Sequence, residues 1–254
     1  MNNVPRIGRI LGTTLLAVTA TLCPAAFYSN SFDADVMDRH WKLASSGVNA
    51  VQAPTRGELE QANGWLFYSA APGDITIPVN ASYVLDGYAL RLDADWTIRV
   101  QAIVDAGREE GTSLPAGATV RMSMGIRAGA ADGSAPYARH AVGISSSDSG
   151  TFTEMSSAGR ASGSGRTTHA KLDRRRPLAD HELTPLVISY NARADTLTMS
   201  AGSITKTIRR FRAQMVRRGF RGDFAVDLSS ESVGISGDRI AMFDNFSVRG
   251  AVAR

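Results

Sequence analysis

Apolar and polar residues alternate along several segments of this chain, and the alternation limits the folds that it can adopt. In the segment 95–106, DWTIRVQAIVDA, every second residue from Trp96 to Val104 is apolar, and most residues between them are polar. The segment 119–129, TVRMSMGIRAG, repeats the pattern from Val120 to Ile126. This spacing is typical of β-strands that bury one face. Further strands are predicted at 64–70, 138–145, 184–191, 195–201, 223–229 and 239–248.

Short polar segments separate these predicted strands. AAPGD, ADGSAP and ASGSG are rich in Gly, Pro, Asp and Ser, the residues that favour turns. Many short strands with such turns predict an antiparallel sandwich or barrel rather than strands that alternate with helices. The sequence shows no internal repeat and no interdomain linker, so it predicts one domain.

Two segments depart from the alternation. The stretch 156–177, SSAGRASGSGRTTHAKLDRRRP, is polar and rich in Gly and Ser, which predicts a long exposed loop with a basic end. The stretch 207–222, TIRRFRAQMVRRGFRG, places Ile208, Phe211 and Met215 at helical spacing. We therefore expect one short amphipathic helix near 207–218, with its arginines mostly in solvent.

The N-terminus has the features of a secretory signal. Arg6 and Arg9 precede the apolar run ILGTTLLAVTATL, and the small residues Ala25 and Ala26 follow it. The run has 13 residues, fewer than the roughly 20 that cross a bilayer as a helix. We predict residues 1–26 as a signal peptide cleaved near Ala25 or Ala26, no transmembrane segment, and a domain at 27–254 that is secreted, periplasmic or at the cell surface.

Cysteine content and charge exclude several classes of function. Cys23 is the only cysteine and lies in the predicted signal, so thiol catalysis, disulfides and cysteine-bound zinc are excluded from the mature domain. A bulky Leu22 before it disfavours lipid attachment. The formal net charge is +4, and loss of the two signal arginines leaves +2. This charge is not typical of a dedicated nucleic-acid binder.

Three segments together resemble a known superfamily. They are the opening FYSNSFDADVMDRHWKL (27–43), GWLFYSA (64–70) and the closing MFDNFSV (242–248), which resemble bacterial members of the concanavalin A-like lectin/glucanase superfamily. The segment ISYNARADTLTMS (188–200) looks like a hairpin of that family. The resemblance extends over nearly all of residues 27–250. It implies an all-β, jelly-roll sandwich of two antiparallel sheets, and a carbohydrate ligand.

The opening stretch SFDADVMDRHW (31–41) gathers four titratable side chains: Asp33, Asp35, Asp38 and His40. It does not fit an EF-hand loop, because Met37 occupies a ligand position and Asp38 stands where that loop needs Gly. We interpret the stretch as structural, with Phe32 buried, a turn capped by Asp38, and Trp41 in the core.

A calcium ion between the first and last strands is a separate expectation. Asp33 and Asp244 are its candidate ligands, since a hard cation needs several oxygens and backbone carbonyls complete such shells. Calcium is the one cofactor that the sequence suggests.

Catalytic motifs of the superfamily and of related folds are not intact in this sequence. Its β-glucan hydrolases carry carboxylates on one strand as Glu-x-Asp-x-x-Glu, and no segment here contains that motif. The Gln-x-His motif of jelly-roll alginate lyases is missing too. No Gly-x-Ser-x-Gly at a strand-to-helix turn indicates a serine nucleophile. The sequence therefore favours a protein without enzymatic activity.

The polar sides of the predicted strands supply candidate binding residues. Planar polar side chains and one aromatic ring suit a sugar, and arginines pair bidentately with carboxylate or sulfate. The candidates are Arg99, Gln101, Arg121, Arg127, Tyr137 and Arg139. If they share one face, they form a site for a polysaccharide or glycan, an acidic one if the arginines are free. The alternative is a solvated sheet face.

Three classes of function remain open. The first is an exported lectin-like or cell-envelope β-sandwich that binds carbohydrate. The second is a divergent polysaccharide hydrolase or lyase with catalytic residues on loops, and the third is a structural or adhesion module that binds protein. Two close carboxylates on the ligand-facing sheet favour the enzyme, and a groove lined by Arg, Gln and an aromatic ring favours the lectin.

Overall fold

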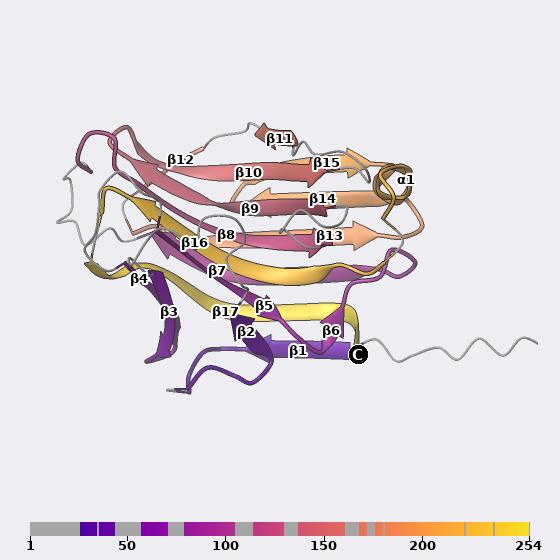
Figure 1. The fold of residues 1–254 in the computed structure, drawn as a ribbon, viewed down its shortest axis with the longest axis horizontal. Coiled ribbons are helices and arrows are strands. Elements are labelled where there is room, and N and C mark those ends of the chain that lie inside the picture. Colours follow the sequence, from indigo (N-terminus) through magenta and orange to yellow (C-terminus); the bar gives the residue numbers. More distant parts are fainter. Residues whose placement is uncertain are drawn as a thin grey trace, which may run out of the picture.

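The computed structural model is a sandwich of two antiparallel β-sheets with one short helix at one end (Figure 1). It describes residues 26–34, 36–43, 57–70, 79–104, 114–129, 137–160, 168–171, 176–179, 181–220, 222–235 and 237–253. The predicted all-β fold is confirmed. The predicted signal peptide, apart from Ala26, lies outside the described residues.

The first sheet has nine strands, in the order β15-β14-β13-β7-β17-β4-β3, with β1 and β6 also paired to β17. Their bounds are β1 Ala26–Asn30, β3 Gly57–Ala62, β4 Trp65–Ala70, β6 Tyr88–Ala89, β7 Trp96–Val104, β13 Thr184–Asn191, β14 Thr196–Ala201, β15 Ile204–Arg209 and β17 Gly237–Ala253. The first and last strands of the described chain thus lie side by side, as the resemblance implies.

The second sheet has eight strands, in the order β11-β10-β9-β8-β16-β5-β2, with β12 paired to β10. Their bounds are β2 Trp41–Leu43, β5 Val79–Leu85, β8 Thr119–Ala128, β9 Tyr137–Ser147, β10 Gly150–Arg160, β11 Thr168–Lys171, β12 Pro177–Leu178 and β16 Ala225–Val233. Neighbouring β8 and β9 run antiparallel over ten residue pairs, from Thr119 opposite Ser147 to Ala128 opposite Ala138.

The core fills the space between the sheets with the apolar residues of the alternation. On β7 the buried set runs from Trp96 to Val104, and on β8 it runs from Val120 to Ala128. Burial of this kind supplies the main stabilisation of a domain without disulfides. The polar residues between them point outward, so each sheet presents an outer polar face.

The opening segment folds as the sequence predicts. Phe32 is fully buried and Trp41 is 4% exposed. The Asp38 carboxylate accepts a hydrogen bond from the backbone N–H of His40 at 2.8 Å, and the Asp38 carbonyl accepts one from Trp41 N at 2.9 Å. Asp38 therefore caps the turn that leads Trp41 into the core.

The predicted long loop at 156–177 is wrong in part. Residues 156–160 continue β10, because Ser156 to Arg160 pair in register with β9. Residues 168–171 form β11, which pairs with the same end of β10. The small Ser, Ala and Gly side chains resemble a loop in composition, but they also suit a strand whose outer face is left open.

The predicted helix is confirmed with narrower bounds. Helix α1 spans Phe211–Arg217 and buries Phe211 and Met215. Ile208, which matches the helical spacing, belongs instead to β15. In the described part of the chain, no helix is long and apolar enough to cross a membrane.

Candidate functional site

A groove of about 590 Å³ crosses the outer face of the eight-stranded sheet. It runs over β5, β8, β9, β10 and β16. Alternation places the side chains there: Val120, Met122 and Met124 are buried in the core, so Arg121 and Ser123 between them face outward. The polar and charged side chains that line it include Asn80, Arg121, Tyr137, Arg139, Glu154 and Glu231.

Small residues form the floor of this groove. A row in register crosses four strands, with Glu154 opposite Gly143, Gly143 opposite Ser123 and Ser123 opposite Ser229. A Cβ on Gly143 would lie 2.1 Å from the carbonyl oxygen of Met122, so no other residue fits there without movement of the backbone. The groove exists because Gly143, Ser123 and Ser229 in this row lack large side chains.

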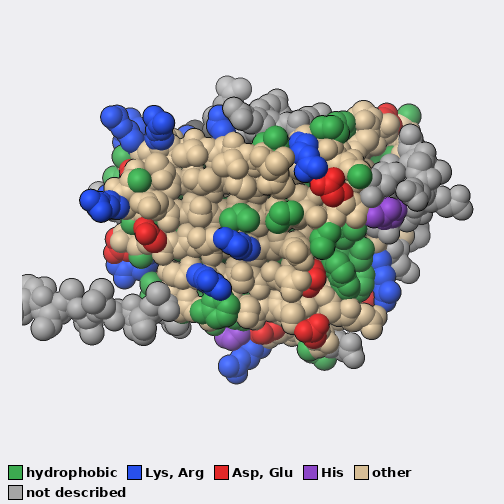
Figure 2. All heavy atoms as spheres, turned by 180° about the vertical axis from the view of Figure 1, so that it is seen from behind, with side chains coloured by type: hydrophobic (Ala, Val, Ile, Leu, Met, Phe, Trp, Pro, Cys, Tyr) green, Lys and Arg blue, Asp and Glu red, His purple; other side chains and the backbone are tan. Residues whose placement is uncertain are grey.

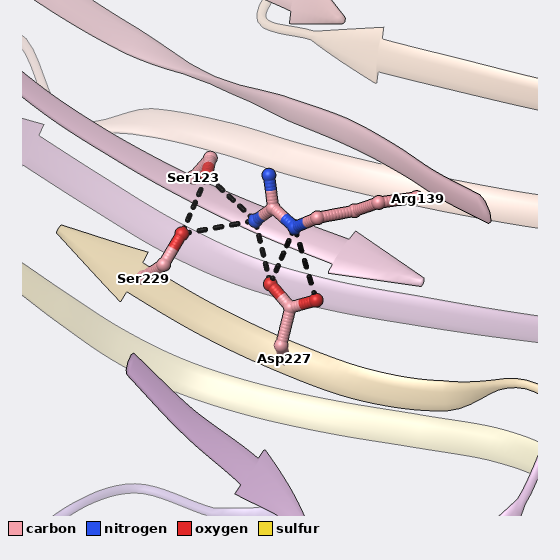
Figure 3. Close-up of polar contacts among 4 residues, drawn as sticks. All are labelled: Ser123, Arg139, Asp227 and Ser229. Atoms are coloured by element: carbon pink, nitrogen blue, oxygen red, sulfur yellow. Dashed lines mark hydrogen bonds and ion pairs between the residues drawn. The ribbon is translucent and has the colours of Figure 1, made fainter. Parts of the chain in front are cut away.

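Arg139 and Asp227 form an ion pair beneath the groove (Figure 3). Arg139 Nη2 lies 2.5 Å from Asp227 Oδ1, and Nε donates to both carboxylate oxygens at 3.1 Å. Nη2 also donates to Ser123 Oγ at 3.0 Å and to Ser229 Oγ at 2.9 Å. The Asp227 side chain is 2% exposed and that of Arg139 is 21% exposed.

The Arg139 guanidinium is held in its ionised form. Burial alone would lower the pKa of Arg139, but the charge of Asp227 and its hydrogen bonds raise that pKa above its usual value. The second terminal nitrogen, Nη1, has no acceptor among the described residues, and Figure 3 shows it pointing away from the three partners. Its N–H groups remain as donors for a ligand.

Arg121 stands between two carboxylates in the same groove. Its Nε lies 3.7 Å from Glu154 Oε2, and its Nη1 lies 3.6 Å from Glu231 Oε1. Glu231 is directly opposite Arg121 in the β8–β16 ladder, whereas Glu154 comes from β10. Glu154 Oε2 is buried and accepts no hydrogen bond within the described part of the protein.

Tyr137 supplies the aromatic ring at one end of the groove. Burial raises the pKa of its hydroxyl, and the nearby charge of Arg139 partly offsets that effect. The hydroxyl is therefore neutral at ordinary pH, and the side chain is only partly exposed. It offers an aromatic ring and a hydroxyl near the Arg139–Asp227 pair.

Three of the six candidate ligand residues line the groove: Arg121, Tyr137 and Arg139. Arg127 lies on β8 in the same sheet but is not a lining residue, whereas Arg99 and Gln101 lie on β7 in the other sheet. The six residues therefore do not share one site, because alternation fixes the side of a strand and not the sheet that the strand joins. Gln101 accepts a hydrogen bond from Asn245 Nδ2 at 3.0 Å.

The outer face of the nine-stranded sheet has a different character. Figure 2 shows it as a broad surface of mostly uncharged polar side chains and backbone, with a few scattered cationic and apolar groups. A row in register crosses it through Thr97, Ser189, Thr198 and Thr207. This face has the composition of a solvated sheet.

Three acidic residues in or beneath the groove are absent from the sequence-based candidates: Asp227, Glu231 and Glu154. Asp227 and Glu231 follow the alternation of β16, since Val226, Leu228 and Ser230 between and beside them are buried, so the alternation indicates both. Glu154 has no such signal, because the sequence predicts no strand over 150–160.

Asp33 and Asp244 lie close together where the first and last strands meet. Burial raises the pKa of Asp244, a hydrogen bond from the Asn245 backbone lowers it, and the charge of Asp33 raises it further. The Asp244 carboxylate accepts bonds from Asn245 N at 2.6 Å and Asn245 Nδ2 at 2.7 Å. No set of three His, Cys, Asp or Glu residues gathers around a cation position in the described ranges.

Comparison with solved structures identifies the fold. An endo-1,3-β-glucanase from Streptomyces sioyaensis superposes with a TM-score of 0.60 at 9% identity, over 88% of this chain and 96% of that chain. A family 16 endo-glucanase from Bacteroides ovatus gives 0.56 at 9% identity, over 87% and 98%. The CBM2 module of the evolved Dit protein of Lactobacillus casei BL23 phage J-1 gives 0.55 at 13% identity, over 91% and 97%.

The chain thus has the concanavalin A-like fold that its opening and closing segments resemble. No family model matches the sequence, and no curated protein matches it. At these identities the similarity concerns the fold, and the function has to be argued from the groove itself.

Proposed function

We propose that the groove on the eight-stranded sheet binds a glycan. The observation that carries the proposal is an open groove with a floor of small residues and polar side chains along it. Arg139 Nη1 offers donors, and the partly exposed carboxylate of Glu231 offers acceptors. Sugar hydroxyls both donate and accept, so a glycan satisfies both groups, and Tyr137 adds an aromatic contact.

The ligand that we propose is an uncharged glycan rather than an acidic one. An acidic sugar needs free cations, but Arg139 is paired with Asp227 and Arg121 with Glu154 and Glu231. These five side chains carry a formal net charge of −1. A carboxylate or sulfate placed there would face three carboxylates, which disfavours it. The sequence favours an acidic glycan only if the arginines are free, and in the groove they are paired with carboxylates.

A glycoside hydrolase is the second candidate, because Glu154 and Glu231 both face the groove. Hydrolysis by two carboxylates needs open space between them for the glycosidic bond and, in inverting enzymes, for a water. Arg121 occupies that position and lies within ion-pair distance of both. The geometry therefore favours binding over hydrolysis.

We propose that calcium, if bound, is held by Asp33 and Asp244. The support is the charge of Asp33, which adds to burial in raising the pKa of Asp244, since a cation beside two neighbouring carboxylates relieves their repulsion. Further ligands would have to come from backbone carbonyls or water. The ion would tie the first strand to the last.

We also propose that the protein is exported and that the mature chain begins near Phe27. The support is the order of basic, apolar and small residues within residues 1–26, which is that of a secretory signal. Sequencing of the N-terminus of the purified mature protein tests this, and an intact Met1 in the exported fraction would contradict it.

Binding to neutral glycans tests the proposed function of the groove. The probes are laminarin, a β-1,3-glucan, and an array of neutral oligosaccharides, with the wild-type protein and the variants Arg121→Gln and Arg99→Gln. Both variants remove one exposed strand arginine, one in the groove and one on the other sheet. We expect Arg121→Gln to lose binding and Arg99→Gln to retain it. Equal loss in both would place the site elsewhere.

A further inference from the structure

The basic charge of this chain is concentrated at one end of the sandwich. The segment from Arg193 to Arg218 contains seven basic residues and one acidic residue, a formal net charge of +6, whereas the whole chain carries +4. Everything outside the segment therefore sums to −2. The β13–β14 turn, the end of β15 and helix α1 lie together at this end, and Lys and Arg side chains gather at the corresponding edge in Figure 2.

The cations at this end are exposed and unpaired. We call them the α1 basic patch: Arg193, Lys206, Arg209, Arg210, Arg212 and Arg217, all exposed. The ion pairs between described residues involve Lys42, Arg91, Arg121, Arg139 and Arg176, and none of them includes a patch residue. In the groove, by contrast, every arginine charge is matched by a carboxylate.

Asp195, the one acid of the segment, is used to hold the patch in place. Its carboxylate accepts hydrogen bonds from Arg212 N at 2.6 Å, Ala213 N at 3.3 Å and the Tyr190 hydroxyl at 3.0 Å. Its carbonyl accepts Phe211 N at 3.1 Å. Asp195 thus caps the helix from the neighbouring turn and joins Arg193 to the start of α1.

Arg210, directly before the helix, has a constrained backbone conformation. Arg210 has φ 54° and ψ 42°, a left-handed conformation that is costly for a residue with a side chain. Phe211 and Met215 anchor the other side of α1 in the core. The arginines are therefore presented on a rigid support, and less conformational entropy is lost when they bind.

We propose that the α1 basic patch binds an anionic polysaccharide that carries carboxylate or sulfate groups. Arginine pairs bidentately with either group, and five of the six patch cations are arginines. Arg218, which follows the patch residue Arg217, approaches β10 from the sheet face opposite to the groove, since a Cβ on Gly159 would lie 3.1 Å from Arg218 Nη1. The choice of a sugar polymer rests on the proposed function of the groove, whereas the anionic charge does not.

A membrane fits the patch less well. Insertion at a lipid surface needs an apolar helix face turned outward. The large apolar residues Phe211 and Met215 of α1 face the core, and Val216 is its one large apolar residue that is exposed, at 54%. Attraction to a bilayer would then be electrostatic only. Anionic lipid is therefore an outcome that the test separates from the proposal.

The test measures binding of labelled polygalacturonate and dextran sulfate, with uncharged dextran as the control polymer, at low and at physiological ionic strength. The patch variant is Arg193→Gln/Arg209→Gln/Arg212→Gln. The charge-matched control is Arg39→Gln/Arg239→Gln/Arg249→Gln, three exposed arginines outside both the patch and the groove. Circular dichroism and thermal midpoints establish that both variants fold. A second patch variant has Lys instead of Gln at the same three positions and so keeps the positive charge.

The wild-type protein is expected to bind both acidic polymers and not dextran, with weaker binding at higher salt. At about fivefold per cation, the patch variant loses roughly a hundredfold in affinity at low salt, and the control and the Lys version retain most of it. Equal loss in the control, or no binding by the wild type, would overturn the proposal. So would equally tight binding to duplex DNA or to phosphatidylglycerol vesicles.

The groove variant Arg121→Gln separates this proposal from the function of the groove. It is expected to lose neutral glycans and keep the acidic polymers, whereas the patch variant does the reverse. If Arg121→Gln has no effect on neutral glycans but the patch variant loses acidic polymers, the groove assignment fails and the patch assignment stands.

Discussion

Because His140 is buried, we predict that the protein loses stability in mild acid. His140 lies on β9 between the sheets, 3% exposed, with its ring edge-on to Phe211 at 5.1 Å between centroids. Neither ring nitrogen has a hydrogen-bond partner in the described part of the structure. Burial, helped by the positive charge of Arg218, lowers the pKa of His140 from 6.5 to about 4.

The direction of the change in stability follows from which state binds the proton. Between pH 6.5 and about 4, His140 is protonated in the unfolded chain and neutral in the folded chain. The stability that comes from keeping this histidine neutral is therefore complete above pH 6.5 and is lost as the pH falls. At one pKa unit per roughly 1.4 kcal/mol, the loss between pH 7.5 and pH 4.5 is about 2.5 kcal/mol.

Urea unfolding of the wild type and of His140→Leu at four pH values from 7.5 to about 4.5 measures this effect. The substitution removes the titrating group and the two unpaired nitrogens, so the variant gains relative to the wild type by about 2.5 kcal/mol on acidification. The carboxylates titrate in both proteins, so their effects on stability cancel in the difference between the two proteins. Parallel stability curves for the two proteins would refute the reasoning.

Four further predictions concern other parts of the fold. Asp227→Ala leaves Arg139 beneath the groove without its carboxylate and should cost about 3 kcal/mol of unfolding free energy in urea; a cost below about 1 kcal/mol would contradict the buried pair. Gly143→Ala places a methyl group against the Met122 carbonyl, so the thermal midpoint should fall by an amount equivalent to about 2 kcal/mol. Asp195→Ala removes the cap of α1 and should cost about 1 to 2 kcal/mol, with an unchanged midpoint as the contrary result. Addition of calcium should raise the thermal midpoint of the wild type but not of Asp244→Asn, and an equal rise in both would exclude this carboxylate as a ligand.

The fold could be predicted from the sequence where large apolar residues stand next to a turn signal and are buried in the structure. Trp41 and Phe32 are large apolar residues beside a turn signal at Asp38, and all three take the predicted places. The strand β10 is not predicted at all, and its residues 156–160 are assigned to a loop, because Ser, Ala and Gly have low strand preference. There the pairing with β9, a tertiary contact, decides the conformation.

The site was predictable only in part, for a topological reason. Alternation shows that Arg99 and Arg121 both point away from the core, but the order of strands in space puts them on opposite sides of the molecule. The net charge of the groove could not be predicted from the sequence for a similar reason. Asp227 is 88 residues from Arg139 in the chain, and nothing in either local sequence indicates that they meet.

The central claim is that the groove over β8, β9 and β16 is a binding site for uncharged glycans. The most direct measurement is calorimetric titration of laminarin and of neutral oligosaccharides into the wild type, Arg121→Gln and Arg99→Gln. The account predicts saturable binding to the wild type and to Arg99→Gln, and its loss in Arg121→Gln. Binding that survives in Arg121→Gln, or the absence of binding to any neutral glycan, would contradict it.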